Sequence, residues 1–432
     1  MKSNPLANIV REQKAGKQTG LYSICSANSF VIEASIMQAV RDNSIACIEA
    51  TSNQVDQFGG YTGMKPADFA AYVKNIAKNF GLPEDRLLLG GDHLGPNTWR
   101  KENSRPAMEK ACDLMSAYAK AGFSKLHLDA SMKCADDNGH APAPEIAAER
   151  AAKLCAAAES AWDSSRNTLP AYIVGTEVPT PGGTALGHDK IHITSAADVA
   201  ETVNEIHEAF IKKRLLDAWE RVHAVVVQPG VEFGDASVDI YQPQKAAGLA
   251  AFMEKQPNLV FEAHSTDFQP GSSLEQLVRN HFAVLKVGPW LTFAFREALF
   301  SLEKIEKEIF FGKGNIKLSE LETTLESSML KNPVYWKNYY SGSESEIAHK
   351  RKYSFSDRCR YYWPLPELEQ AIALLLNNLS GREIPLSLLD KQLPFQAELI
   401  RKGAILPGPR ALIHSKIMEV TSLYSKACGF SN

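Results

Sequence analysis

Short apolar runs alternate with amphipathic segments along roughly the first 300 residues of the chain. Each run is brief and almost wholly apolar, which is typical of parallel strands that helices cover on both faces. We predict eight such strands, at residues 20–25, 46–50, 87–91, 125–129, 172–175, 224–228, 259–263 and 283–287. The segments between them have helical periodicity. Residues 107–121, for example, are followed by Gly122, the residue type that most often ends a helix.

About eight strand–helix units predict an α/β fold, a closed parallel (β/α)8 barrel of the TIM type. An open, doubly wound sheet is the alternative, and it would carry a glycine-rich phosphate turn after its first strand. The first predicted strand is instead followed by Ser26-Ala27-Asn28. The sequence therefore favours the barrel.

The pattern changes after about Leu302. Residues 303–311, 318–330 and 367–376 have helical periodicity, and no clear strand lies among them. We therefore expect two parts, a barrel formed by residues 1–302 and a helical C-terminal extension of residues 303–432 that packs on it. The extension contains an unusually aromatic stretch at residues 353–364.

Composition and charge exclude several classes of function. The 432 residues carry a net charge of −3 at pH 7, without a basic stripe or patch, so we expect neither nucleic acid nor a membrane surface as a partner. No apolar run reaches the roughly 18 residues that a membrane span needs, and the N-terminus lacks the apolar region of a secretory signal. The seven cysteines are scattered without a C-x-x-C pair, which predicts reduced thiols and a cytoplasmic protein.

Polar side chains follow seven of the predicted strands. In a (β/α)8 barrel the loops after the strands converge at one end, and the chemistry takes place there. The polar segments are residues 49–63, 91–97, 127–131, 175–183, 228–232, 262–267 and 286–289. We therefore expect a site built from several strand ends.

The pair Asp92-His93, after the third strand, is the sharpest feature of this set. His93 and His264, with Glu177 between them in barrel order, are candidate ligands of a divalent metal such as zinc. A metal there would polarise a sugar carbonyl, and Asp92 would move a proton as general acid or base. The alternative is a set of hydrogen-bonded polar groups without a metal, because no H-E-x-x-H motif is present.

A phosphate site is expected at the last two loops, where barrels often bind phosphate through backbone N–H groups. Ser265 and Thr266 follow the seventh strand, and Gly288 follows the eighth. Lys286 either adds positive charge to this site or points into the barrel. Further candidate contacts to a substrate are the polar residues Asn53, Gln54, Asn97, Asp129 and Glu232. Asp129 is equally well explained as a carboxylate that anchors its own loop.

Long stretches of the chain resemble one known family, the Z-type subunits of tagatose-1,6-bisphosphate aldolase. The matching stretches are residues 48–64, 90–97, 226–233, 262–267 and 285–289, together with Ser356-Asp357-Arg358. The resemblance covers nearly the whole chain. Some members were formerly described as tagatose-6-phosphate kinases.

This resemblance implies an accessory, non-catalytic subunit. Z subunits associate with a class II aldolase, the Y subunit, which cleaves D-tagatose 1,6-bisphosphate to glycerone phosphate and glyceraldehyde 3-phosphate. The Z subunit supports the activity and stability of that partner in the catabolism of galactitol or of N-acetylgalactosamine and galactosamine. The sequence leaves open which pathway is served and whether the chain also forms a homo-oligomer.

The barrel is also distantly similar to the class II aldolases themselves. In those enzymes an Asp-His pair after the third strand supplies a proton donor and a zinc ligand, and Asp92 and His93 match that pair. His264 matches another zinc histidine, whereas the remaining zinc position is Gln228, a poor zinc ligand. The resemblance therefore implies a weakened or lost zinc site, unless Glu177 or Glu232 replaces the missing ligand.

Two other functions stay in view. Some relatives are credited with C4 epimerisation of ketohexoses or their phosphates, which retro-aldol cleavage and re-addition at one metal would explain. In that case Asp92, Asp267 and Glu177 are the candidate catalytic residues. A sugar kinase is disfavoured, because the sequence has no G-x-x-x-x-G-K-[ST] loop.

The role of Arg358, in the aromatic stretch, has two interpretations. An arginine side chain can bind a substrate phosphate through two parallel hydrogen bonds. A structural salt bridge with a neighbouring carboxylate is the alternative.

Overall fold

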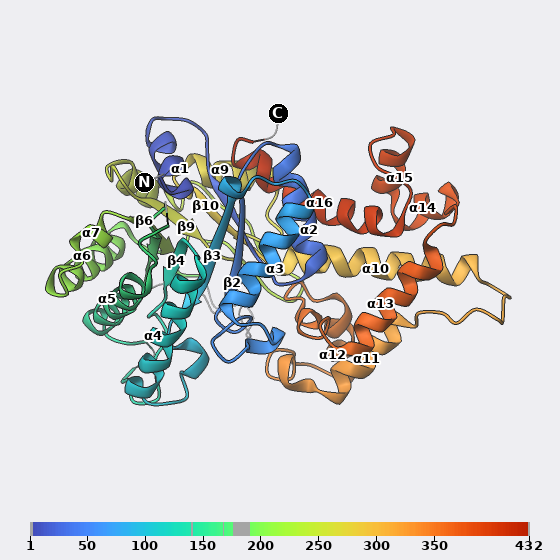
Figure 1. Ribbon diagram of the computed structural model, residues 1–432, viewed down its shortest axis with the longest axis horizontal. Helices are drawn as coiled ribbons and strands as arrows, with labels where there is room; N and C mark the ends of the chain where they lie inside the picture. Colours follow the sequence, from blue (N-terminus) through green and yellow to red (C-terminus); the bar gives the residue numbers. More distant parts are fainter. Residues whose placement is uncertain (1–2, 140, 167, 176–190, 431–432) are drawn as a thin grey trace.

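The computed structural model describes residues 3–139, 141–166, 168–175 and 191–430. At its centre is a closed barrel of eight parallel strands in the order β1-β10-β9-β6-β5-β4-β3-β2 (Figure 1). The barrel strands are β1 (Leu21–Cys25), β2 (Ala46–Thr51), β3 (Leu87–Leu94), β4 (Lys125–Leu128), β5 (Ala171–Val174), β6 (Val222–Val227), β9 (Val260–Ala263) and β10 (Val284–Val287). Each predicted strand overlaps one of these, so the predicted TIM barrel is confirmed. A short antiparallel ribbon, β7 (Glu232–Phe233) and β8 (Val238–Asp239), lies in the loop after β6.

Helices surround the barrel. They are α2 (Ser29–Arg41), α3 (Pro66–Asn79), α4 (Ser104–Ala121), α5 (Pro144–Ala161), α6 (Ala196–Lys212), α7 (Leu216–Trp219), α8 (Ala247–Glu254), α9 (Gly271–Arg279) and α10 (Pro289–Ile309). The helix predicted at residues 107–121 is α4. It ends at Gly122, whose φ of 89° is the left-handed conformation expected at a glycine C-cap.

The two ends of the barrel interior differ in polarity. Helix α1 (Pro5–Lys14) places Leu6, Ile9 and Val10 against apolar residues such as Leu21 and Leu88 at the N-terminal ends of the strands. Further along the strands the interior is polar and charged. The polar side chains of the barrel interior therefore gather at the end where the sequence predicts a site.

The chain after the barrel is helical. It forms α11 (Leu321–Lys331), α12 (Glu344–Tyr353), α13 (Pro366–Leu379), α14 (Leu386–Gln392), α15 (Pro394–Arg401) and α16 (Pro409–Ala427). Figure 1 shows α11 to α15 beside the barrel, whereas α16 returns to it and packs against α2, α9 and α10. The expected division at residue 302 stays a prediction; that residue lies inside α10, which reaches from the barrel to the extension.

The aromatic stretch of the extension packs on the loops after the barrel strands. Phe355 stacks on Phe268, with ring centroids 4.3 Å apart, and Tyr361 meets Tyr61 edge to face at 5.0 Å. The extension thereby contributes side chains to the open end of the barrel. In the described part of the chain, no helix combines the length and the apolar character that crossing a membrane requires.

Candidate functional site

A pocket opens at the C-terminal ends of the strands, and we call it the inner pocket. It brings together many of the predicted site residues. Those in its lining are Asn53, Gln54, Asp92, His93, His264, Ser265, Asp267, Lys286 and Gly288. Arg360 and Tyr361, from the C-terminal extension, complete the wall.

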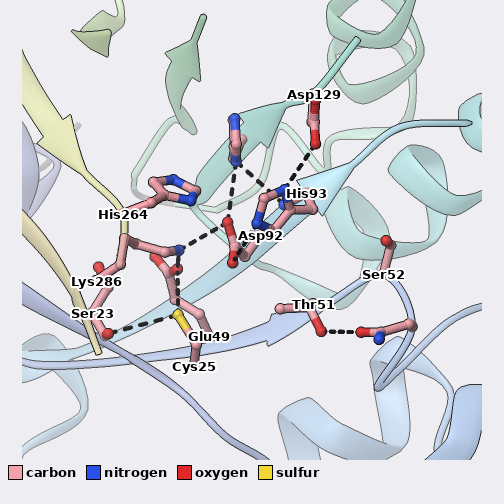
Figure 2. A network of polar contacts seen from close by, with 12 residues as sticks. Ser23, Cys25, Glu49, Thr51, Ser52, Asp92, His93, Asp129, His264 and Lys286 are labelled. Atoms are coloured by element: carbon pink, nitrogen blue, oxygen red, sulfur yellow. Dashed lines mark hydrogen bonds and ion pairs between the residues drawn. The ribbon is translucent and has the colours of Figure 1, made fainter. Parts of the chain in front are cut away.

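A buried ion network lies at the floor of this pocket (Figure 2). Lys125 Nζ is 2.6 Å from both Glu49 Oε1 and Glu262 Oε2, and none of these side chains is exposed. Lys286 contacts Glu49 and lies 2.9 Å from Asp92 Oδ1. Burial alone would raise the pKa of Glu49 and Glu262, but the two lysines lower both below their ordinary values. The network is therefore charged at neutral pH.

Three histidines lie close to this ion network. The ring centroids of His93, His127 and His264 lie 5.0 to 5.4 Å apart. Each ring has its own carboxylate: His93 Nδ1 is 2.8 Å from Asp129, His127 Nδ1 is 3.1 Å from Asp92, and His264 Nε2 is 2.9 Å from Glu262. Carboxylates in this position fix the orientation of histidines that bind metals.

The backbone is unusual at two of these strand ends. His93 has a φ of 50° and Ser265 a φ of 53°, a region that residues with side chains seldom adopt. In β3 the register also shifts between Gly91 and Leu94. Strained conformations of this kind cluster at functional sites, where the surrounding structure holds them in place.

The residues present fit a divalent cation. One ligand atom from each of Asp92, His127, Glu262 and His264 lies within 4.8 Å of the others, and all four side chains are buried. His127 Nε2 is buried and has no hydrogen-bond partner among the described residues. Two imidazoles and two carboxylates are ligands that suit zinc and several other divalent metals.

This cluster differs from the predicted metal ligands. His264 belongs to both sets, and His93 lies beside the cluster. Gln228 is engaged elsewhere: its Oε1 accepts hydrogen bonds from the N–H groups of Gly230 at 2.8 Å and Val231 at 3.0 Å. Glu177 lies outside the described residues.

Three of the four residues predicted at the phosphate site, Thr266, Lys286 and Gly288, already have partners within the chain. Asp267 Oδ1 accepts hydrogen bonds from the N–H groups of Gly288 at 3.0 Å and Trp290 at 2.8 Å, at the start of α10. Thr266 Oγ1 donates to the carbonyl of Lys286 at 2.6 Å and lies 3.1 Å from the hydroxyl of Tyr424 on α16. Lys286 points into the barrel, which is the second of the two expected arrangements.

The other predicted contacts divide into two groups. Asn53, Gln54 and Ser265 line the inner pocket. Asp129 orients His93 and anchors its own loop, because its Oδ1 accepts hydrogen bonds from the N–H and the hydroxyl of Ser131.

Three further candidates do not line the pocket. Asn97 lies in a 3-10 turn, Pro96–Trp99, and Glu232 accepts a hydrogen bond from the N–H of Phe233 at 3.0 Å. Arg358 packs over the ring of Tyr339, 3.0 Å from its centroid, and Nη1 donates to the carbonyl of Tyr335. This arrangement contains no salt bridge to Arg358 among the described residues, and the binding of a phosphate by Arg358 stays a prediction.

The sequence of this chain matches a known protein family over nearly its whole length. Residues 6–429 match the sequence model of the family described as D-tagatose-1,6-bisphosphate aldolase subunit GatZ/KbaZ-like. The chain belongs to the GatZ/KbaZ-like family. The resemblance seen in the sequence is therefore confirmed.

Relatives of this GatZ/KbaZ-like chain match it from end to end. A D-tagatose-1,6-bisphosphate aldolase subunit GatZ from Klebsiella pneumoniae is 47% identical, over 98% of this chain and 99% of the relative. One from Escherichia coli is 47% identical over 98% and 100%. A crystal structure from Sinorhizobium meliloti, named a probable tagatose 6 phosphate kinase, has a TM-score of 0.87 and 42% identity, and the match covers 95% of this chain and 100% of that one. The helical extension is therefore shared with these relatives.

Sequence reasoning missed two members of the cluster in this GatZ/KbaZ-like barrel, His127 and Glu262. A signal for both was present, since each stands two residues from another polar residue, Lys125 or His264, in an otherwise apolar strand. Alternate residues of a strand share one face, so such pairs point together into the barrel.

Proposed function

We propose that this chain is the accessory, non-catalytic subunit of a D-tagatose 1,6-bisphosphate aldolase. Its role would be to raise the activity and stability of a class II catalytic subunit. The observation that carries this proposal is the 47% identity, over 98% of the chain, to relatives named as subunits of that aldolase. The proposal includes a cytoplasmic location, which the seven free cysteines support, and a role in galactitol or N-acetylgalactosamine and galactosamine catabolism.

The chemistry of Gln228 supports the non-catalytic part of this proposal. An amide side chain can bind a metal only through its oxygen, and Gln228 Oε1 is occupied by two backbone N–H groups. The zinc arrangement of a class II aldolase would therefore lack one ligand in this barrel.

Association with the catalytic subunit tests the proposal. We expect this chain and a class II tagatose-bisphosphate aldolase subunit to elute together in size-exclusion chromatography. We also expect the catalytic subunit to unfold at a higher temperature in the mixture. Separate elution with unchanged unfolding temperatures would reject an accessory role.

A second candidate function is a metal-dependent C4 epimerase of ketohexose phosphates. The buried cluster of Asp92, His127, Glu262 and His264 favours it, because a purely structural subunit has no need of four converging ligands. A divalent ion held by His127, Glu262 and His264 would supply Lewis-acid polarisation of the sugar carbonyl, which leaves Asp92 for proton transfer.

The carboxyl groups of the inner pocket suit the proton transfers of such an epimerase. Burial would raise the pKa of Asp92, but His93 and Lys286 hold it well below its ordinary value, so Asp92 is an ionised base. It would take the proton of the C4 hydroxyl as the C3–C4 bond breaks. The aldehyde would then rotate to present its other face. Once the C3–C4 bond has formed again, Asp92 would return the proton to the new C4 hydroxyl. Burial raises the pKa of Asp267 to about 6, which suits a group that donates a proton near neutral pH.

Interconversion of fructose 6-phosphate and tagatose 6-phosphate tests this second function. The assay would compare chelator-treated protein with protein that has received zinc, manganese or magnesium. Metal-dependent interconversion that Asp92→Asn abolishes would support it. Protein that binds no metal and converts neither sugar would reject it.

A further inference from the structure

A second, larger cavity adjoins the inner pocket, and we call it the outer cavity. Its wall includes Asn28 from the loop after β1, and Trp363 and Leu376 from the C-terminal extension. Four residues line both spaces: Cys25, Gln54, Tyr61 and Arg360. Arg360 therefore stands where the two spaces meet.

The guanidinium of Arg360 is held by neutral groups. Nη1 donates to the carbonyls of Ser356 and, at 3.1 Å, Asp357, and Nη2 donates to the hydroxyl of Tyr361 at 3.0 Å. A guanidinium has five N–H groups, so these contacts leave Nε and one hydrogen of Nη2 for a ligand. A guanidinium presents its N–H groups in one planar fork, so free donors on two of its nitrogens can bind two oxygens of a phosphate.

The acidic residue nearest to Arg360 in sequence, Asp357, forms no ion pair with it. Asp357 Oδ1 is 3.1 Å from Arg296 Nη1, and Asp357 Oδ2 accepts a hydrogen bond from Thr292 at 2.6 Å. No carboxylate among the described residues forms an ion pair with Arg360. Burial alone would raise the pKa of Tyr361, but Arg360 and Arg358 lower it, which reflects the excess positive charge here.

The other cationic groups of the two spaces are already paired. Lys286 contacts Glu49 and Asp92, and Arg410, in the outer cavity, lies 2.9 Å from Glu33. The N–H groups at the start of α10 are bound by Asp267. Among the described residues that line either space, Arg360 is thus the one lysine or arginine without a carboxylate partner.

We propose that Arg360 and the hydroxyl of Tyr361 bind the phosphate of a ketohexose monophosphate, and that the site takes one phosphate and not two. The C-terminal extension would then select the substrate, since it supplies both residues. This inference rests on the second candidate function, in which the inner pocket binds a sugar phosphate. It is independent of the accessory role.

The test is calorimetric titration of the full-length chain with four probes: D-tagatose 6-phosphate, D-tagatose 1,6-bisphosphate, D-tagatose and inorganic phosphate. We expect the monophosphate to bind at least about tenfold more tightly than the unphosphorylated sugar, and the bisphosphate to gain nothing over the monophosphate. Arg360→Gln should lower the affinity for the monophosphate about tenfold to a hundredfold and leave the affinity for the unphosphorylated sugar unchanged.

Two further variants make this test specific. Arg360→Lys keeps the charge but removes the paired donors, so its affinity should fall between those of wild type and Arg360→Gln. Arg382→Gln removes an exposed arginine of the extension and should leave the affinity for each probe unchanged. Unfolding temperatures show whether each variant is folded.

Three results would overturn the inference. A bisphosphate that binds at least about tenfold more tightly than the monophosphate would reveal a second phosphate site. Equal affinity of folded Arg360→Gln and wild type would remove Arg360 from the site. If folded wild type binds none of the four probes, the second candidate function falls with the inference, whereas the accessory role is still decided by co-elution.

Discussion

Glu49 on β2 occupies the space that a side chain at Gly90 on β3 would fill. A Cβ built on Gly90 would lie 2.5 Å from Glu49 Cγ and 2.6 Å from Oε1. The same carboxylate contacts Lys125 and Lys286. The absence of a side chain at residue 90 thus makes room for the buried ion network.

Gly90→Ala should therefore destabilise the barrel. The new methyl group must displace Glu49 from its lysines, and we expect the free energy of unfolding to fall by about 3 kcal/mol or more. Gly248→Ala is the matched control, because a Cβ there meets nothing within 4 Å and the residue is helical. The control should be neutral or stabilising by up to about 1 kcal/mol. Urea denaturation measures both, and equal effects would contradict this account of Gly90.

His127→Gln tests the metal cluster at the residue that sequence reasoning missed. Removing one of four converging ligands should weaken zinc binding at least about a hundredfold, by analogy with losses of 10- to 100-fold for supporting groups alone. Competition with a chromophoric chelator measures the affinity. His349→Gln, which alters a histidine on α12, is the control. Equal zinc affinity of wild type and His127→Gln would show that the cluster does not bind the metal.

Glu232 should make stability depend on pH. Burial raises its pKa in the folded chain to about 7, well above its ordinary value. The folded state then holds a proton that the unfolded chain has released, so stability falls as the pH rises from about 4.5 through 7. The full effect is up to about 3 kcal/mol. When the pH is raised from 5 to 8, the free energy of unfolding of Glu232→Gln, measured by urea denaturation, should rise by about that amount relative to wild type. An equal difference between the two proteins at both pH values would contradict the assignment.

The ion pair between Arg296 and Asp357 should contribute strongly to the stability of the C-terminal extension. Both side chains are fully buried, so Arg296→Met would leave the Asp357 charge without its cation and lower the free energy of unfolding by about 3–5 kcal/mol. Arg105→Met breaks the exposed pair with Glu109 and should cost less than about 1 kcal/mol. A similar small effect for both variants would contradict this role of the buried pair.

The barrel was predictable from sequence because its strands are short apolar runs separated by amphipathic helices. Asp92, His93 and His264 were predictable as well, because each stands where such a run ends. His127 and Glu262 were harder to recognise, since they lie within or at the end of strands where buried charges are rare. Glu262 on β9 is held by Lys125 on β4, and His127 on β4 is held by Asp92 on β3, so their place in the site depends on contacts between strands.

Arg360 could not be chosen over Arg358 from the sequence. The two arginines are separated by one residue in a single 3-10 turn, Arg358–Tyr361. Arg360 lines the pocket, whereas Arg358 packs on Tyr339. The turn follows Asp357, which has a φ of 46° and whose carboxylate is held by Arg296. That contact joins residues far apart in the chain, so local sequence carries no sign of it.

The central claim, an accessory role, is tested most directly by the cleavage of D-tagatose 1,6-bisphosphate. Three samples are compared: this chain alone, a class II catalytic subunit alone, and the two mixed. We predict that this chain alone does not cleave the bisphosphate and that the mixture cleaves it faster than the catalytic subunit alone. Turnover by this chain alone, or a mixture no faster than the catalytic subunit, would contradict it.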